Sequence, residues 1–519
     1  MQANKKSGGV RLMLLFVLIA LGATFSLWQL SGRPNKWFQG GKPDPLTQVL
    51  QLIQERYVDN LVTDSLIGLP LDSLMARIDP HSVYLNPLEL RKANEDLSDR
   101  FAGIGIGYGW LRDTLTVSYV YAGSPGETAG LKTGDQLLAI GTTSLLGFQK
   151  NSEKLLSLIR GPVGSYASLT VSTEGKVRQV SIQRAAISTP AVTHAYLIND
   201  SIGYIKLVKF STGSYRECVS ALDSLIQNGM RSLILDLRSN GGGFLQEAVD
   251  LADEFLADDR LILYTEGAHL KKRSYFCKRP GLFERGKLTI LINESSASAS
   301  EVLAGALQDW CRAKIIGRRS FGKGLVQEQF DLSNNAALRL TVARYFTPLG
   351  RCIQRPYLGS HQQYRSNGQL ANPENLPVQL KKYLSPCGDT LIEGGGIRPD
   401  LEIPPDELLA VNPAAFTFIN SPDLIIWSYR YFTHYNIRID SFKEPTSWAL
   451  LPPDNQMKRY FEQYALPDSI SIRPNDWKRI QLEGYLQGIR LQRSESEFFR
   501  IQQLYDPYVL QAIQFLTSP

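Results

Sequence analysis

The sequence predicts a multidomain α/β protein with a largely parallel sheet at its centre. The chain has 519 residues, too many for one compact core, and its 43% hydrophobic content is ordinary for a globular protein. From Ile202 onward, apolar strand patterns alternate with amphipathic helix patterns, as far as the strand "AKIIG" that ends at Gly317. Strands without interior polar residues, separated by helices, are typical of a parallel sheet covered on both faces.

The N-terminal residues combine positive charge with a long apolar run. Lys5, Lys6 and Arg11 fall within residues 1–11 and precede an apolar stretch over residues 12–30. That length is close to the roughly 20 residues that a helix needs to cross a bilayer. Since positive charge favours the cytoplasmic side, we expect an inner-membrane helix followed by a periplasmic chain. A cleaved signal peptide is the alternative, although the run has no clear Ala-x-Ala site.

Changes in composition divide the rest of the chain into four segments. Residues 31–98 form a linker and a helical region. Residues 99–185 combine glycine-rich turns, short apolar strands and one amphipathic helix pattern, which predicts a compact β-rich unit. Residues 186–404 hold the alternating α/β pattern, and residues 405–519 are rich in aromatic residues and are predicted to be helical.

Aromatic residues of the last segment, Trp427, Tyr429 and Phe432, either pack as core or form a homodimer surface. We favour core.

Charge and cysteine content narrow the functional classes. The formal net charge is +6, and the cations are scattered instead of gathered in a stripe with aromatic residues, so nucleic-acid binding is not expected. The cysteines show no CxxC pair and no zinc-ligand spacing, so no metal site is expected. An exported location would allow one or two disulfides among them. The cysteines are Cys218, Cys277, Cys311, Cys352 and Cys387.

A serine-rich turn separates a predicted strand from a predicted helix. The strand ends at Asn293 and apolar residues recur at helical spacing from Ala299, so Ser298 is the predicted N-cap. Glu301, three residues later, would complete a capping box, which needs no catalysis. A helix N-terminus also favours attack by a serine oxygen on a carbonyl group, because free N–H groups there stabilise the oxyanion that forms.

A candidate base lies in the segment "GRRSFGKGLVQEQF". Lys323 stands between Gly322 and Gly324, where the backbone can approach closely. Gln327, four residues later, lies on the same side of the chain as Lys323. Its uncharged amide can orient the lysine amine without stabilising the charged form of that amine. At pH 7.4 only about 0.1% of a lysine with the ordinary pKa near 10.4 is neutral, so burial must lower the pKa of a lysine base.

Two other interpretations of this lysine remain open. Residues 317–323 satisfy GxxxxGK, the pattern of a phosphate-binding loop. That loop needs Ser or Thr next and then a helix, whereas Gly324 and a strand-like segment follow here. The other alternative is a surface lysine in a glycine loop.

The segment "LDLRSNGGGF" is the third candidate element. Glycines 241–243 lie between a predicted buried strand and a predicted helix. Because they lack Cβ atoms, their backbone N–H groups could face a ligand directly. A plain turn is the alternative.

Together, the motifs SASASE, FGKGxxxQ and LDLRxNGGG resemble those of the carboxyl-terminal processing peptidases, also called tail-specific proteases. The resemblance extends through "DPHSVYLNP", "YFTPLGRCIQ" and "GGGIRPD" and covers roughly residues 45–402. It implies a ClpP/crotonase-like α/β protease core and a serine peptidase without a cofactor. In this family pattern Ser298 is the nucleophile, Lys323 the base and Gln327 the residue that orients it. Gly242 and the amide of Ala299 form the oxyanion hole.

The β-rich unit resembles a PDZ domain, through "GIGIGY" and the later "GSPGETAGLKTGDQLLAIG". Successive N–H groups of such a glycine loop can capture a peptide's terminal carboxylate while an added strand pairs with the sheet. A β-bulge is the alternative for the loop. The loop residues are Gly103, Ile104, Gly105 and Ile106. On the following helix, the residues that either line an apolar groove or pack as core are Leu155, Leu156 and Ile159.

These features predict a membrane-anchored serine endopeptidase of the cell envelope that holds free, apolar C-termini of protein or peptide substrates and cuts upstream through an acyl-enzyme. A catalytically inactive PDZ scaffold or adaptor is the alternative. Whether the chain forms a homodimer or binds an adaptor protein is left open. His81, His194 and His269 lie far from Ser298 in sequence and are expected to be structural or surface residues.

Overall fold

The fold is described from a computed structural model. It covers residues 44–61, 70–111, 114–146, 152–173, 175–257, 259–357, 364, 381–404, 413–438, 454–464, 473–493, 495–503 and 506–518. The predicted membrane span at residues 12–30 lies outside these ranges. Within them, no helix has the length and apolar character that crossing a bilayer would require.

A six-stranded sheet forms the centre of the molecule, in the order β10-β11-β12-β15-β16-β21. All neighbours from β11 to β21 are parallel, and β10 is antiparallel to β11. This confirms the predicted parallel sheet. The strands are β10 (Val192–Leu197), β11 (Ile202–Leu207), β12 (Ser232–Asp236), β15 (Lys287–Ile292), β16 (Lys314–Gly317) and β21 (Leu401–Glu402).

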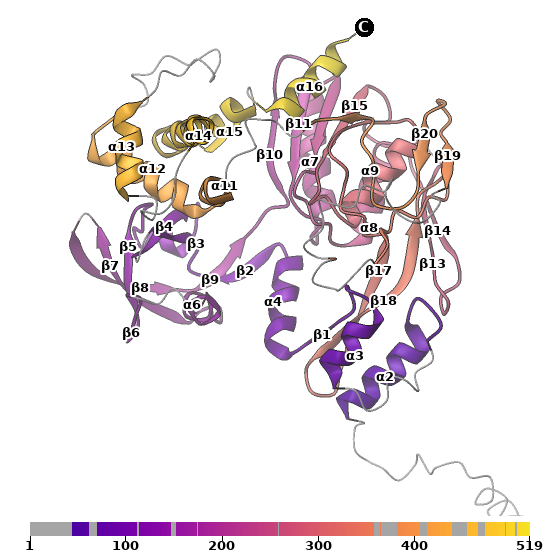
Figure 1. Cartoon of the computed structure of the whole chain (residues 1–519), viewed down its shortest axis with the longest axis horizontal. Coiled ribbons are helices and arrows are strands. Elements are labelled where there is room, and N and C mark those ends of the chain that lie inside the picture. The colour runs from indigo at the N-terminus through magenta and orange to yellow at the C-terminus, as the bar shows by residue number, and fades with distance from the viewer. Residues whose placement is uncertain are drawn as a thin grey trace, which may run out of the picture.

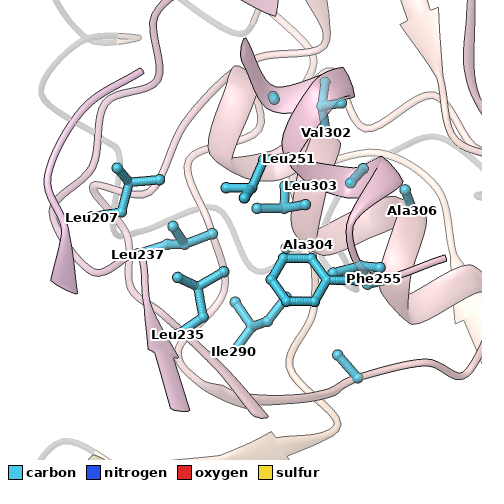
Figure 2. Close-up of a cluster of buried hydrophobic side chains, with 14 of the residues drawn as sticks. Leu207, Leu235, Leu237, Leu251, Phe255, Ile290, Val302, Leu303, Ala304 and Ala306 are labelled. Carbon is cyan, nitrogen blue, oxygen red and sulfur yellow. The ribbon is translucent and has the colours of Figure 1, made fainter. Parts of the chain in front are cut away.

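Helices cover both faces of this sheet, as its continuous apolar strands predict. On one face, Leu235 and Ile290 of the sheet meet Phe255 and Leu303 from the helical layer (Figure 2). On the other face, Val509 and Ala512 of α16 (Pro507–Thr517) pack against Ile234. Figure 1 shows α16 in yellow above the sheet. The first face is covered by α7 (Ser214–Gln227), α8 (Leu245–Asp253) and α9 (Ala299–Asp309), and the second by α16 (Pro507–Thr517).

A second, antiparallel sheet was not foreseen from the sequence. Its order is β1-β18-β13-β14, with β17 paired to β18. Two N-terminal helices pack on it, and their Val49 and Leu74 join a core cluster with Leu338 and Leu340. The elements are α2 (Pro45–Arg56), α3 (Leu71–Ile78), β1 (Val83–Leu85), β13 (Leu261–Glu266), β14 (Arg273–Phe276), β17 (Leu325–Asp331) and β18 (Ala337–Phe346).

The predicted β-rich unit is an antiparallel sheet in the order β3-β4-β5-β7-β8, with β6 paired to β5. Helix α4 and the pair β2–β9 join it to the rest of the molecule (Figure 1). The elements are α4 (Pro87–Leu97), β2 (Arg100–Gly103), β3 (Ile106–Leu111), β4 (Thr114–Val120), α5 (Pro125–Thr128), β5 (Gln136–Ile140), β6 (Thr143–Ser144), α6 (Ser152–Ile159), β7 (Tyr166–Thr173), β8 (Lys176–Gln183) and β9 (Ala185–Ser188).

The C-terminal segment forms a helical bundle, as predicted, that lies against β3 and β4 (Figure 1). Trp427 and Phe432 are core residues of the bundle, which confirms the favoured alternative. Tyr429 instead packs beside Gly134 of the β-rich unit. The helices are α11 (Pro413–Ile419), α12 (Pro422–His434), α13 (Asn455–Tyr464), α14 (Pro474–Gln492) and α15 (Glu495–Gln503).

A disulfide ties two exposed points of the protein together. Cys311 follows the last turn of α9, and Cys387 lies between β19 (Lys382–Leu384) and β20 (Thr390–Ile392). The bond closes a sequence separation of 76 residues. It therefore anchors the β19–β20 hairpin to the helix that begins at Ser298.

Candidate active site

Ser298 occupies a strained turn between β15 and α9. Its backbone has φ 55° and ψ −114°, a conformation that residues other than glycine rarely adopt. Such strain persists only where surrounding contacts enforce it. One contact is the hydrogen bond that the Ser298 amide donates to Glu301 Oε2, at 2.8 Å, which is one half of the predicted capping box.

Lys323 lies in an extended segment before β17, where its amine is held by one neutral side chain. Its Nζ donates to Gln327 Oε1 at 2.7 Å, and Gln327 Nε2 donates to the carbonyl oxygen of His81 at 2.7 Å. Because the His81 carbonyl can only accept, it turns the amide oxygen of Gln327 toward the lysine. His81 thus contributes its backbone, while its ring contacts Tyr364.

The surroundings of Lys323 favour its neutral form. Burial lowers the pKa of Lys323 below its ordinary value, and the positive charge of Arg339 lowers it further. Asp79 and Glu301 oppose the shift through their negative charges. A strand, not a helix, follows the lysine, so the phosphate-binding loop suggested by GxxxxGK is wrong for this segment. The surface-lysine alternative does not fit either, because Lys323 is half-buried and lines a pocket.

The glycine turn approaches Ser298 closely. A Cβ added to Gly242 would stand 2.8 Å from Ser298 Cβ and 2.9 Å from the Ala299 nitrogen. Ala299 is the first residue of α9, where backbone N–H groups have no partner within the helix. The Gly242 N–H donates to Asn240 Oδ1 at 2.9 Å, so it must leave or share that acceptor to bind an oxyanion. Its oxyanion role stays a prediction.

Glu301 joins the serine turn to the lysine segment. This fully buried carboxylate accepts hydrogen bonds from the amides of Ser298, Gly322 and Lys323 at 2.8, 2.7 and 2.9 Å. It also accepts from the Ser320 hydroxyl. Burial raises the pKa of Glu301, and these donors oppose that rise. The sequence showed Glu301 only as a capping residue, because its other donors lie about 20 residues away in the chain.

Tyr345 is a second connection that the sequence analysis missed. Its hydroxyl, from β18, donates to the Ser298 carbonyl oxygen at 3.1 Å and contacts the Lys323 carbonyl oxygen. The side chain is buried, and burial raises the pKa of its hydroxyl. Two backbone segments that carry Ser298 and Lys323 are therefore fixed to one side chain of the second sheet.

A pocket of about 600 Å³ brings these residues together. Ser298, Lys323 and Gln327 lie on its wall, beside the glycine turn and the end of α4. Its described lining contains no histidine. The lining residues are Asn94, Leu97, Ser98, Thr212, Gly241, Gly242, Gly243, Phe244, Leu245, Ser298, Ala299, Val302, Lys323, Leu325, Val326, Gln327, Gln329, Arg339 and Tyr345.

The wall of this pocket carries a serine hydroxyl and a lysine amine. Among the residues that the structure describes, no group of three or more His, Cys, Asp or Glu side chains could hold a metal ion. A hydroxyl and an amine are groups between which a proton can be transferred, and free N–H groups at a helix start can stabilise an oxyanion.

The predicted carboxylate-binding loop is held by hydrogen bonds within the β-rich unit. Gly105 has φ 75°, and its carbonyl oxygen accepts from the Tyr121 amide and the Ser124 hydroxyl. Ile104 and Ile106 are buried in the core of the unit, while Gly103 pairs with Ala185. A role of the loop in binding a carboxylate stays a prediction.

The predicted groove residues on α6 do not share one environment. Leu155 and Ile159 are buried in the core cluster of the β-rich unit, which is the alternative that the sequence left open. Their side chains therefore offer little surface to a peptide. Leu156 is half-buried and is the best placed of the three to line a groove.

Two family models and several known proteases are similar to this chain. A model of peptidase family S41 matches residues 201–363, and a PDZ domain model matches residues 116–172. A carboxyl-terminal-processing protease of Synechocystis is 34% identical over 345 residues, which are 63% of this chain and 79% of that protein. A probable CtpA-like serine protease of Staphylococcus epidermidis is 31% identical over 310 residues, which are 59% of this chain.

The chain spans 62% of the length of this staphylococcal relative. Among solved structures, the photosystem II D1 C-terminal processing protease is similar, with a TM-score of 0.41 and 23% identity. The match covers 70% of this chain and 93% of that structure. The chain therefore belongs to peptidase family S41 and, within it, to the carboxyl-terminal processing proteases with a PDZ domain.

Proposed function

We propose that this protein is an active serine endopeptidase in which Ser298 attacks the peptide bond and Lys323 is the general base. The observation that carries the proposal is the hydrogen bond from Lys323 Nζ to the neutral amide of Gln327 on the wall of the pocket that Ser298 also lines. A carboxylate in place of that amide would hold the lysine protonated. The neutral acceptor and the burial leave the amine able to take a proton.

The reaction follows from these positions. Neutral Lys323 accepts the Ser298 hydroxyl proton as the oxygen attacks the substrate carbonyl carbon. The Ala299 amide and the glycine turn would stabilise the oxyanion that forms. Lys323 then passes the proton to the leaving amine, which departs and leaves an acyl-enzyme. A water molecule, deprotonated by the same lysine, hydrolyses the ester and restores Ser298.

The PDZ domain would hold a substrate tail while the pocket cuts upstream. Helix α4 supports this arrangement, because its C-terminal residues Asn94 and Leu97 line the pocket and the chain then continues through β2 into the PDZ domain. The apolar pocket residues Leu245, Val302 and Leu325 suit an apolar substrate side chain. Tethering raises the local concentration of the scissile bond, so weak affinity for the tail suffices.

The proposed location is the cell envelope, with the peptidase outside the cytoplasm. The positive charge before residues 12–30 and the apolar character of that stretch support a membrane anchor. The Cys311–Cys387 disulfide supports an oxidising compartment, because cytoplasmic reductants keep such pairs reduced.

The test compares wild type with Ser298→Ala, Lys323→Ala and Lys323→Arg on a protein substrate that has an apolar C-terminus. All three variants are expected to lose cleavage, the last because arginine keeps its proton. Ser295→Ala is the matched control, since Ser295 is an exposed serine of the same turn outside the pocket lining. Equal cleavage by all variants would show that Ser298 and Lys323 are not the catalytic pair. No cleavage by wild type would instead support the inactive PDZ scaffold.

A further inference from the structure

Arg339 is a cation on the wall of the catalytic pocket, and the proposed mechanism uses its charge near Lys323 but not its hydrogen-bond donors. It lies on β18, is half-buried, and lines the same pocket as Ser298 and Lys323. Its Nη2 donates to the neutral Gln329 Oε1 at 3.1 Å. Within the described part of the chain, no carboxylate lies within 4.0 Å of its guanidinium.

Among the described residues, two arginines close to Arg339 in the sequence pair with carboxylates, unlike Arg339. Arg344 of β18 forms a bidentate pair with Asp59, with both distances 2.8 Å. Arg351 is buried against Asp309. These arginines serve the fold through acidic partners, whereas Arg339 offers its remaining donors to the pocket.

The pocket has no negative charge of its own to balance Arg339. Its described lining holds two basic side chains, Lys323 and Arg339, and neither Asp nor Glu. Because Lys323 must be neutral to act as a base, the permanent charge is that of Arg339. A guanidinium keeps its proton even when partly desolvated. A bound peptide would displace the water that surrounds the Arg339 guanidinium. This cation would then lack a strong hydrogen-bond acceptor unless the peptide supplied one.

We propose that Arg339 makes the peptidase selective for substrates that carry a carboxylate close to the scissile bond. The proposal rests on the proposed function and adds a class of substrate to it. A guanidinium and a carboxylate form charge-assisted, bidentate hydrogen bonds, which are among the strongest polar contacts in proteins. The carboxylate comes either from an Asp or Glu side chain or from the free C-terminus of a short tail.

The experiment uses the full-length protein and matched peptides of one apolar sequence. One series carries Asp or Asn at each position around the scissile bond, with an amidated C-terminus. A second series carries no acidic residue. Its peptides differ in the distance between the scissile bond and the C-terminus, and each is made with a free and with an amidated C-terminus. The first series tests a side-chain carboxylate and the second tests the terminal carboxylate. The readout is the ratio of kcat/KM for the acidic peptide to that for its neutral partner.

Wild type should prefer the acidic peptide about tenfold or more in at least one series. Arg339→Gln should bring that ratio close to one, and Arg339→Lys should retain part of it. The ratio should also fall as salt is raised. Arg344→Gln is the matched control, because it removes the same charge from the same strand outside the pocket, and it should leave the ratio unchanged. A wild-type ratio near one, or an unchanged ratio in Arg339→Gln, would overturn the proposal.

A binding measurement separates this proposal from the proposed function. In the Ser298→Ala background, the acidic peptide should bind more tightly than the neutral one, and Arg339→Gln should remove the difference. If wild type cleaves nothing but this difference is present, Arg339 selects ligands and the peptidase function is wrong. If peptides are cleaved without any Arg339-dependent preference in binding or rate, the peptidase function stands and the selectivity is wrong.

Discussion

At the scale of single residues, the site depends on a short chain of hydrogen bonds that ends at a backbone atom. The His81 carbonyl fixes the amide of Gln327, and that amide fixes the amine of Lys323. Below its pKa, Lys323 is protonated and cannot accept the serine proton. If Lys323 is the proposed base, activity should therefore rise with pH through the pKa of Lys323, which burial places below the ordinary lysine value.

Gln327→Glu tests this chain. A carboxylate beside Nζ would favour the ammonium form and raise the pKa of Lys323, so kcat/KM at neutral pH should fall by about tenfold or more. Activity should return at higher pH. Gln327→Met, which removes the acceptor without adding charge, should lower the rate without that upward displacement of the pH profile. Identical pH profiles for wild type and Gln327→Glu would show that Lys323 is not the group that titrates.

The strained backbone of Ser298 leads to a prediction about stability. Glycine adopts φ 55° and ψ −114° freely, whereas alanine keeps the strain of serine. Ser298→Gly should therefore be more stable than Ser298→Ala by about 1 kcal/mol, although both are inactive. Thermal unfolding of the two inactive variants measures the difference. A lower Tm for the glycine variant would mean that the turn is not strained.

At the scale of elements, the sequence predicted the central strands and helices, because their apolar residues recur at the spacing typical of strands or helices. It predicted Ser298, Lys323 and Gln327 from motifs and a family resemblance. It missed the second sheet and, with it, Tyr345 and Arg339. Strand β18 pairs with β1 across about 250 residues of sequence, and such long-range pairing leaves no local pattern.

Helix α9 illustrates how a motif without a catalytic role supports the site. Arg351, within the segment "YFTPLGRCIQ", is buried and donates through Nε to Asp309, the last residue of the helix, at 2.8 Å. Gln308 accepts from the same guanidinium at 3.0 Å. This contact holds the C-terminal end of α9, the helix that Ser298 caps at its start.

Arg351→Met should destabilise the protein by about 3–5 kcal/mol, because it leaves the Asp309 carboxylate buried without its partner. The double variant Arg351→Met with Asp309→Leu should recover part of that loss, since no buried charge then remains. Arg344→Met, which breaks a more exposed ion pair, is the control and should cost less than about 1 kcal/mol. Chemical denaturation measures all four proteins. Equal losses for the two single arginine variants would contradict this account of Arg351.

At the scale of the whole molecule, the C-terminal segment contacts both the PDZ domain and the protease core. Helix α12 packs beside β3 and β4, with Pro422 against Gly109 of β3 and Tyr429 against Gly134 before β5. Beyond the bundle, Asp506 pairs with Arg238 at 2.6 Å, beside the glycine turn, and α16 covers the open face of the central sheet. Sequence analysis predicted helices here but not their partners, because an amphipathic face does not specify the surface it covers.

Two adjacent residues of α16 test its role in the core. Val509 is fully buried against the sheet, and Leu510 is 48% exposed. Val509→Asp should destabilise the protein by about 3 kcal/mol or more, because it places a carboxylate in an apolar interface. Leu510→Asp should change stability by less than about 0.5 kcal/mol. If both substitutions had the same effect on Tm, α16 would not be part of the core.

The most direct test of the central claim is a titration of Lys323 itself. Heteronuclear NMR of isotope-labelled lysine side chains in the Ser298→Ala protein would follow its amine, with Lys323→Met to assign the signal. The account predicts that Lys323 loses its proton well below the pH at which the exposed lysines do. A Lys323 that titrates together with the exposed lysines, or above them, would contradict it.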